Sequence, residues 1–325
     1  MNKTMLSILK VLDKKPDTII GSREISKRLT THGVDLTERT VRYHLRILDE
    51  RGFTKVYGKE GRKITAKGRD ELGKSLVSEK VGFVINKIET LAFMTDFDLS
   101  EKKGNVILNV SFFRENTLAK VLKIMKDVFM TRYCMSDRVV LSKAGDIIGD
   151  IVVPEGYAGF GTVCSVTING IFLKAGIPVA SKFGGVLQIE EGNPSRFVAL
   201  ISYEGSSLDP LEIFIKSNMT DISGAIKYNS GKILASFREL PLVCLERAKE
   251  MNERMIEEGI GGILALGNPN QPLLQMPVGV DKAGMVVVGG LNPVAAVEEA
   301  GIPTQSSAMS TLFEYSDLVR FRDLL

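Results

Sequence analysis

The feature of this 325-residue sequence that most restricts its fold is an internal repeat. Residues 158–178 align without gaps to residues 283–303, and seven of the 21 positions are identical, including a closing Ala-Gly-Ile-Pro in both copies. Upstream, Met-Thr-Asp occurs at 94–96 and again at 219–221, and Phe-Arg-Glu occurs at 113–115 and again at 237–239. A repeat of this length indicates a duplicated structural unit. The sequence therefore predicts two similar halves, spanning about residues 81–205 and 206–325.

The two halves share one predicted order of elements. A strand (106–112; 233–237) precedes an amphipathic helix (118–130; 243–258), which is followed by an apolar strand (139–141; 262–266) and a Gly-rich strand-turn-helix. Helices and strands mix without strict alternation, so we expect an α/β or α+β fold. Duplicated folds often place a ligand cleft where their halves meet, although that tendency alone identifies no site.

The first 75 residues differ from the rest of the chain in charge. They hold 18 Lys and Arg against 10 Asp and Glu, a net charge of +8, whereas the remainder carries −5. Basic charge gathered at one end of a chain indicates a polyanionic partner, and no apolar stripe accompanies it that would suit a membrane surface. We therefore predict a nucleic-acid-binding domain at 1–75 and a second domain at 76–325.

Apolar spacing within the first 75 residues predicts three helices and a hairpin. The first helix contains residues 5–12, the second begins at Ser22, and the third follows the N-cap residue Thr37. Two short strands are expected at 53–57 and 62–65, around a Gly-rich turn. Three helices followed by a hairpin is the order of a winged helix-turn-helix, whose third helix enters the major groove of DNA.

The expected DNA contacts lie on the third helix and on the wing. Arginine can read guanine, and tyrosine and threonine can meet phosphates or a thymine methyl group. The predicted contact residues are Arg39, Thr40, Arg42, Tyr43, Arg46, Lys59, Arg62 and Lys63. For any one of them, a place on a solvated face is as good an interpretation as contact with DNA.

The residues of the second domain do not favour catalysis. No histidine follows His44, so a Ser-His-Asp or Cys-His arrangement cannot form there. Cys134, Cys164 and Cys244 are widely spaced, which favours reduced thiols over a zinc site or a disulfide framework. The Gly-rich segments match neither the dinucleotide fingerprint nor the P-loop. We expect no enzyme, no catalytic or metal-binding residues and no cofactor.

The hydrophobic pattern bears on localisation. No apolar run approaches the roughly 20 residues that span a bilayer, and the first ten residues are too polar for a signal peptide. We therefore expect a cytoplasmic protein with no membrane partner.

The Gly-rich turns suggest a ligand site. A turn that leads into a helix can present backbone N–H groups to a carboxylate or phosphate. The expected ligand-binding residues are Gly161, Thr162, Cys164, Ser165, Asn169 and Lys182. Equally, these glycines could allow the duplicated halves to pack closely, with Cys164 an ordinary buried thiol. The residues alone leave both interpretations open.

Two regions together resemble the NrpR family of nitrogen-responsive transcriptional repressors from methanogenic archaea and their relatives. One is Gly-Thr-Val-Cys-Ser-Val-Thr-Ile-Asn-Gly at 161–170, with Lys-Ala-Gly-Ile-Pro-Val at 174–179 and Phe-Gly-Gly at 183–185. The other is Arg-Thr-Val-Arg-Tyr-His-Leu at 39–45. The resemblance covers essentially the whole chain.

The resemblance implies a homodimer, or a higher homo-oligomer, that binds inverted-repeat operators on double-stranded DNA at nitrogen-assimilation promoters. It implies that 2-oxoglutarate is the effector and releases the DNA, with residues 161–165 around Cys164 responding to it. Family members with one regulatory domain sometimes act with a separate NrpR-family chain.

A ligand can control such a repressor only by binding one arrangement of the winged helices better than another. The predicted helical link at 67–95 could set the spacing of two recognition helices, which must lie about 34 Å apart. Two other functions remain open: an RNA-binding or non-specific DNA-binding winged helix with a structural assembly domain, and an enzyme acting on a carboxylate metabolite.

Overall fold

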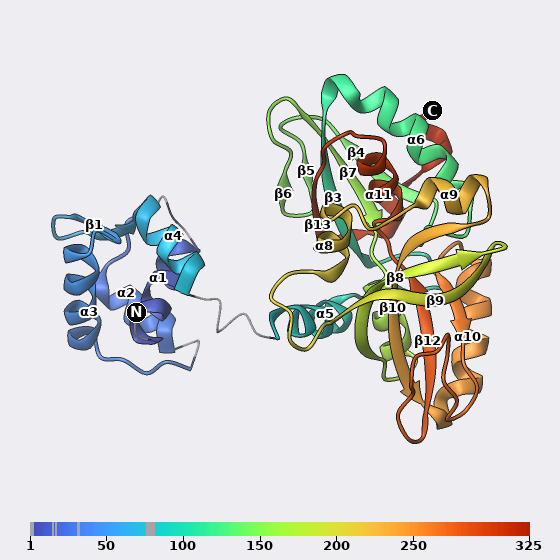
Figure 1. Ribbon diagram of the computed structural model, residues 1–325. Coiled ribbons are helices and arrows are strands. Elements are labelled where there is room, and N and C mark those ends of the chain that lie inside the picture. Colours follow the sequence, from blue (N-terminus) through green and yellow to red (C-terminus); the bar gives the residue numbers. More distant parts are fainter. Residues whose placement is uncertain (1–2, 15, 17, 31–32, 76–81) are drawn as a thin grey trace. The chain divides into compact units, whose positions relative to one another are not determined.

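The computed structural model describes residues 3–14, 16, 18–30, 33–75 and 82–325 (Figure 1). The chain forms two compact units, Met1–Val81 and Gly82–Leu325. The division falls six residues after the boundary expected from the charge pattern. The two units are described separately below.

The first unit has the predicted winged-helix order. It consists of α1 (Lys3–Asp13), α2 (Ser22–Thr30), α3 (Glu38–Glu50), β1 (Thr54–Tyr57), β2 (Gly61–Ile64) and α4 (Ala66–Ser75). Thr37 is the N-cap of α3, and its side chain accepts a hydrogen bond from the Thr40 amide at 3.3 Å. The core is made by the apolar stripes of the three helices, among them Ile8, Ile25 and Leu45, all fully buried. The predicted winged-helix fold is confirmed.

The wing is joined to the helical body by one short contact. Ile20 and Arg62 form an antiparallel bridge, with both backbone N–H···O distances near 3 Å (3.0 and 3.1 Å). Gly61 precedes this bridge with a φ of 143°, and a Cβ there would collide with the Ile20 carbonyl. A glycine is therefore required where the hairpin approaches the backbone of residue 20.

The helical link expected at 67–95 consists of two helices, α4 and α5 (Phe83–Met94). Gly82 precedes α5 in the left-handed conformation, at φ 78°. The middle of the predicted link, residues 76–81, lies outside the described residues.

The second unit contains two five-stranded antiparallel sheets (Figure 1). The first half supplies β3 (Asn105–Arg114), α6 (Leu118–Phe129), β4 (Arg138–Ser142), β5 (Ile147–Ile148), β6 (Ile151–Val152), β7 (Tyr157–Val163), α7 (Val166–Lys174), β8 (Ala180–Glu190) and β9 (Asn193–Ser202). The second half supplies α8 (Pro210–Lys216), α9 (Ile222–Lys227), β10 (Gly231–Pro241), α10 (Leu245–Glu257), β11 (Ile263–Leu266), β12 (Lys282–Val288), α11 (Asn292–Glu299), β13 (Gln305–Glu314) and β14 (Val319–Arg320). The mixed fold of helices and sheets is as expected.

The two halves exchange strands. The sheet orders are β13-β3-β7-β4-β14 and β11-β12-β10-β8-β9. In each sheet a long strand from one half, β13 or β8, pairs with the first strand of the other half, β3 or β10. Each half therefore completes the sheet of the other, and one continuous apolar core includes residues from both sheets. Neither half can bury its own sheet edge alone.

Strand register corrects part of the repeat alignment. Phe113 pairs with Ala158 in one sheet, and Leu240 pairs with Ala283 in the other. Because Ala158 and Ala283 are equivalent, Phe113 corresponds to Leu240 rather than to Phe237. The 3-10 turns that follow, Glu115–Thr117 and Leu242–Cys244, keep the same offset. The recurring Phe-Arg-Glu was therefore aligned three residues out of place.

Helix α5 packs closely against α7. A Cβ at Gly170 of α7 would overlap the Thr95 side chain and lie 2.9 Å from the Ala92 carbonyl oxygen. The Thr95 hydroxyl in turn donates to the carbonyl of Asn105, at the start of β3. Helix α5 is thus held on the second unit by close backbone approach. Among the helices of the described residues, none is long and apolar enough to cross a bilayer.

Candidate nucleic-acid interface and ligand pocket

The surface of α3 presents the predicted basic side chains to solvent. Val41, Leu45 and Leu48 are fully buried, which leaves Arg39, Arg42, Tyr43 and Arg46 exposed on the other side of the helix. The exposed fraction of Tyr43 is 59%, an unusual value for an aromatic ring with nothing to cover it. Thr40 is half-buried because its hydroxyl lies 2.9 Å from that of the N-cap Thr37.

Two of the α3 arginines are held in position by carboxylates on the same helix. Arg42 pairs with Glu38 at 2.6 Å and also donates to the Ser22 hydroxyl at 3.1 Å. Arg46 lies 3.3 Å from Glu50. Exposed pairs of this kind contribute little to stability. A phosphate or a guanine edge could replace the carboxylate at small cost.

The three predicted wing residues differ in their surroundings. Lys59 is exposed at the hairpin tip, and Lys63 lies with its ammonium 5.5 Å from the centre of the Tyr57 ring. Arg62 is different, because its guanidinium donates to Asp49 at 2.8 Å and both side chains are largely covered. Arg62 therefore fixes the wing to the end of α3, and we keep Lys59 and Lys63 as the wing residues free to meet phosphates.

The second unit contains a fully buried arginine. Arg238 lies on β10 with an exposed fraction of 1%. Its guanidinium donates to the Ser165 carbonyl at 3.0 Å, to the Ser165 hydroxyl at 2.9 Å, to the Asn169 side-chain oxygen at 2.5 Å and to the Ser236 hydroxyl at 3.2 Å. Every one of these acceptors is neutral.

None of the hydrogen-bond partners of Arg238 carries a negative charge that would balance its positive one. Among the described residues, no carboxylate forms a salt bridge with it. Burial lowers the pKa of Arg238 to about 10, so the side chain remains protonated at neutral pH. A buried charge without a counter-ion is costly. The four neutral hydrogen bonds position this guanidinium but leave its charge unpaired.

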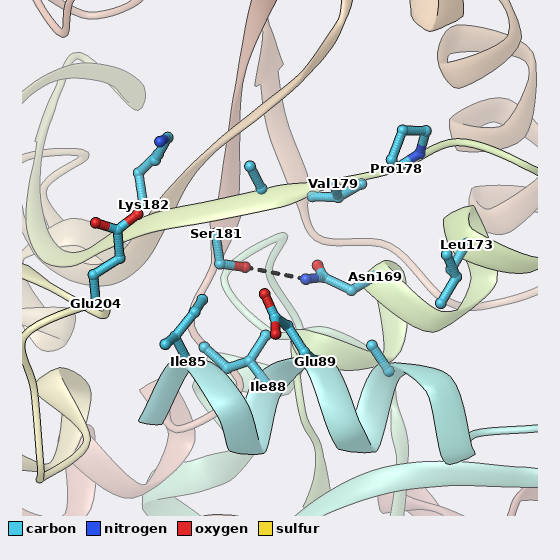
Figure 2. A pocket seen from close by; sticks show the side chains of 12 residues that line it. Ile85, Ile88, Glu89, Asn169, Leu173, Pro178, Val179, Ser181, Lys182 and Glu204 are labelled. Atoms are coloured by element: carbon cyan, nitrogen blue, oxygen red, sulfur yellow. Dashed lines mark hydrogen bonds between the residues drawn. The ribbon is translucent and has the colours of Figure 1, made fainter. Parts of the chain in front are cut away.

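Arg238 is hydrogen-bonded to Asn169, and Asn169 lines a cavity of about 230 Å³ (Figure 2). Asn169 forms part of its wall and donates to the Ser181 hydroxyl across it at 3.0 Å. The remaining lining is contributed by α5, by the end of α7 and by β8, and consists of Ile85, Ile88, Glu89, Ala92, Leu173, Pro178, Val179, Ala180, Lys182 and Glu204. An apolar wall with a few convergent polar groups is typical of a small-molecule site.

The cavity wall carries charges of both signs. Lys182 is its one cation among the described lining residues, and its ammonium lies 3.9 Å from Glu239 outside the cavity wall. Glu89 and Glu204 are carboxylates, and Figure 2 shows Glu89 rising from α5 beneath Ser181. In this arrangement an anion would be drawn by Arg238 and Lys182 and repelled by Glu89 and Glu204.

The residues of the Gly-rich turn at 161–165 are not part of the cavity wall. Gly161 and Thr162 lie in β7 and do not line the cavity. A Cβ at Gly161 would meet Val140 at 2.5 Å, and the Thr162 hydroxyl donates to the Gly290 carbonyl at 2.9 Å. Gly290 belongs to the equivalent turn of the second half, and a Cβ there would lie 3.2 Å from the Cα of Cys164. These glycines allow the two turns to pack against each other.

The amides at the start of α7 are already used within the chain. Thr167 donates to the Cys164 carbonyl at 3.1 Å, and Ile168 donates to the Ser165 carbonyl at 3.2 Å. Cys164 is buried, and burial raises the pKa of its thiol to about 11. The hollow beside it measures only about 10 Å³, no more than one water requires. Of the six expected ligand residues, the structure brings only Asn169 and Lys182 to the cavity, with Ser165 behind them.

Sequence reasoning missed Arg238, Ser181 and Glu89 as site residues. A signal for Arg238 was present, since it follows the mostly apolar run Ile-Leu-Ala-Ser-Phe at 233–237 of a predicted strand. An arginine in a strand that reads as buried needs buried partners. Those partners, Ser165 and Asn169, are about 70 positions away in the chain (|i−j| of 73 and 69), and the sequence does not identify them.

Comparison with known proteins finds a family model that matches each of the two units. The model of the family described as "NrpR regulatory domains NRD1 and 2" matches residues 81–320, which includes the cavity, Arg238 and both sheets. The chain belongs to the NrpR family. A second model, described as "Ribonuclease R winged-helix domain", matches residues 6–72 of the first unit.

Named NrpR relatives align over nearly the whole chain. The global nitrogen regulator NrpRI of Methanosarcina mazei is 38% identical over 98% of this chain and 98% of its own length. The global nitrogen regulators NrpR of Methanococcus maripaludis and Methanocaldococcus jannaschii are 30% and 31% identical, and this chain spans only 52% and 56% of their lengths. All three relatives are named as regulators.

A solved structure of an NrpR-like protein has the same fold. The crystal structure of a nitrogen repressor-like protein from Methanococcus jannaschii is 31% identical, with a TM-score of 0.63, and the match covers 73% of this chain and 98% of that one.

Proposed function

We propose that this NrpR-family chain is a transcriptional repressor of nitrogen-assimilation genes that binds an inverted-repeat operator as a dimer and is released by 2-oxoglutarate. The observation that carries the DNA-binding part is the exposed arginine face of α3 on a unit with a net charge of +8. A helix with this face suits the major groove, and the surrounding charge suits the phosphate backbone.

The effector site that we propose is the cavity in front of Arg238. A dicarboxylate needs two cationic or N–H-donating contact points, and two cations are available in Lys182, which lines the cavity, and Arg238, which is hydrogen-bonded to Asn169 in its wall. Ser181 and Asn169 supply neutral hydrogen-bonding groups between them. This assignment moves the centre of the site from the turn at 161–165 to α7, β8 and β10.

Release of DNA follows from the position of Glu89. A dianionic ligand beside Ser181 would repel this carboxylate, and Glu89 lies on α5, the first helix after the link to the winged helix. The ligand therefore binds better to a state in which α5 has moved away from the cavity. A shift of α5 changes where the preceding winged helix is anchored, so effector affinity is coupled to DNA affinity.

The direct test of the site is calorimetric titration of the full chain with 2-oxoglutarate. Lys182→Ala is expected to weaken binding about tenfold or more, because it removes one of two cations. The control Lys249→Ala removes a lysine that pairs with Glu246 on the surface of α10, and it should leave the affinity unchanged. Equal affinity in the wild type and in Lys182→Ala would place the effector elsewhere.

The nucleic acid is tested separately. The full chain is titrated with a nitrogen-assimilation promoter fragment, with random duplex DNA and with RNA of the same length at fixed salt. We expect the promoter fragment to bind most tightly. Equal affinity for all three, with a steep dependence on salt, would favour a non-specific nucleic-acid-binding protein instead.

A further inference from the structure

The turn that follows α7 recurs with the same geometry after α11. Both turns read Ala-Gly-Ile-Pro, at 175–178 and at 300–303. Their glycines have φ angles of 74° and 75°, and each glycine amide donates to the carbonyl three residues earlier at 2.9 Å. Both turns are helix C-caps of the kind that a left-handed glycine forms. The residue after each proline, Val179 or Thr304, therefore takes the same place beside the end of its helix.

In the second half of the unit, this place holds a carboxylate. Glu298, near the end of α11, accepts hydrogen bonds from the Thr304 amide at 2.8 Å and from the Thr304 hydroxyl at 2.6 Å. The Lys216 ammonium of α8 pairs with the same carboxylate. Burial alone would raise the pKa of Glu298, but hydrogen bonds from Lys216 and Thr304 lower it, so the group is ionised at neutral pH. The fold thus contains a carboxylate site that one of its own side chains fills.

In the first half, the same place opens into the cavity. Leu173 stands at the position of Glu298, and Val179 follows it across the turn. Both residues line the cavity, and Figure 2 shows Leu173 at the end of α7 below Val179. Within the described part of the chain, the half-buried Val179 amide has no hydrogen-bond acceptor. Unpaired amides away from water are rare in folded proteins. The Val179 amide is therefore a donor at the cavity wall whose counterpart binds a carboxylate.

We infer that a carboxylate of the effector accepts a hydrogen bond from the Val179 amide, in the place that Glu298 takes in the second half. The identity of the effector rests on the proposed function, whereas the carboxylate chemistry rests on the duplicated turn. Lys182 on the same cavity wall is the cation available to this carboxylate, as Lys216 is in the second half. A charged acceptor makes such a hydrogen bond stronger than one to a neutral oxygen.

The second half differs from the first at both contact points. Its carboxylate place is filled by Glu298. By the strand register, Ser111 of β3 is the counterpart of Arg238 of β10, and each faces a serine, Ser306 or Ser181, on the paired strand. The second half thus has a serine where the first half has its buried guanidinium. We therefore expect each chain to bind one effector molecule, in the first half of the duplicated unit.

Nuclear magnetic resonance of the full-length chain with isotope-labelled valine tests the contact directly. The Val179 amide signal is identified by its loss in Val179→Ala. On titration with 2-oxoglutarate we expect this signal to move to lower field, because the amide gains a charged acceptor. The Thr304 amide, observed with isotope-labelled threonine, should keep its position. Calorimetry should give one 2-oxoglutarate per chain.

Leu173→Glu copies the arrangement of the second half into the first. The Leu173 side chain is 43% exposed, so the fold tolerates a polar substitution. The introduced carboxylate should accept from the Val179 amide itself and weaken 2-oxoglutarate binding about tenfold or more. Leu173→Met is the matched control, since it adds no acceptor oxygen, and its affinity should stay within about twofold of the wild type. Without any ligand, the Val179 signal should be moved in Leu173→Glu and not in Leu173→Met.

Three outcomes would overturn the inference. One is a Val179 signal that stays in place while calorimetry shows 2-oxoglutarate bound. Another is a Leu173→Glu chain that keeps both the affinity and the Val179 signal of Leu173→Met, and the third is two molecules bound per chain. If 2-oxoglutarate does not bind the wild type at all, the effector named in the proposed function is wrong. The ligand-free comparison of Leu173→Glu with Leu173→Met then still decides whether the Val179 amide donates to a carboxylate.

Discussion

At the scale of single residues, several buried polar groups of the second unit have hydrogen-bond partners in distant segments of the chain. Arg238 is the clearest case, because three of its four hydrogen bonds join β10 to Ser165, before α7, and to Asn169 in α7. The sequence predicted Ser165 and Asn169 as site residues for their chemistry, and both contact this guanidinium. It also predicted Gly161 and Thr162, which lie in β7 and serve packing, because a glycine required for close approach and one required for ligand access look alike in a sequence.

On the winged helix, Arg46→Ala is expected to weaken binding to a promoter fragment about 10–100-fold, the loss of one arginine–base contact. The fold should be unchanged, since Arg46 is exposed and pairs only with Glu50 on the same helix. Fluorescence anisotropy at fixed salt measures the effect. Arg69→Ala on α4 is the matched control for loss of one positive charge, and an equal loss of affinity in both variants would contradict a specific role for α3.

Asp209 gives a pH-dependent prediction. Burial, with Glu212 nearby, raises the pKa of this carboxyl group from 3.8 to about 6. The folded state therefore holds the proton more tightly than the unfolded state, and the resulting stability is present below about pH 4 and lost as the pH rises through about 6. Asp209→Asn keeps the N-cap acceptor for the Leu211 and Glu212 amides and removes the buried charge.

The Asp209→Asn variant should therefore be more stable than the wild type by about 1–3 kcal/mol at pH 7–8, and of similar stability at pH 4. Calorimetric unfolding of the second unit between pH 4 and 8 measures the difference. A difference that does not change over this pH range would show that the charge of Asp209 is not the cause.

At the scale of elements, local signals predicted the winged helix well and the duplicated unit only in outline. The apolar stripes and the Thr37 cap fix α1 to α3 within the chain segment itself, so few distant contacts are needed. The exchange of β8 and β13 between the halves depends instead on strand pairing across long sequence separations. The periodicity of apolar residues gives no information about such pairing. The misplaced Phe-Arg-Glu repeat has the same origin, because a shared tripeptide carries no information about strand register.

Helix α5 is the element on which the regulatory proposal depends. Its buried face holds it on the second unit, and its Glu89 lines the cavity. A ligand in the cavity would thus act on the first helix that follows the winged helix in the chain. The sequence predicted a helical link at 67–95 as the part that sets the spacing of the recognition helices, and that role stays a prediction.

Glu89→Gln should tighten the binding of 2-oxoglutarate about three- to tenfold, because it removes a carboxylate that faces the proposed dianion. Less effector should then be needed to release DNA. Calorimetry and an operator-release titration measure the two effects, with Glu250→Gln on the surface of α10 as the control. Unchanged or weaker affinity in Glu89→Gln would contradict the repulsion on which release is said to depend.

At the scale of the whole molecule, a basic winged helix and a regulatory unit with an unpaired buried arginine are joined by a short connection. The charge difference between them was evident in the sequence, and so was the duplication. The position of the cavity was not, because its wall combines α5, α7 and β8, which come together only when the two sheets have formed. The proposed effector site thus depends on residues that only the tertiary structure brings together, whereas the proposed DNA contacts lie within one short segment of the chain.

The most direct test of the account is fluorescence anisotropy of a labelled nitrogen-assimilation promoter fragment with the purified full-length chain, titrated with 2-oxoglutarate at fixed salt. We predict tight binding to this fragment over random DNA, release by 2-oxoglutarate, and no release by glutarate, which lacks the keto group. Specific binding that 2-oxoglutarate leaves unchanged, with the ligand also failing to bind the free protein, would contradict the central claim.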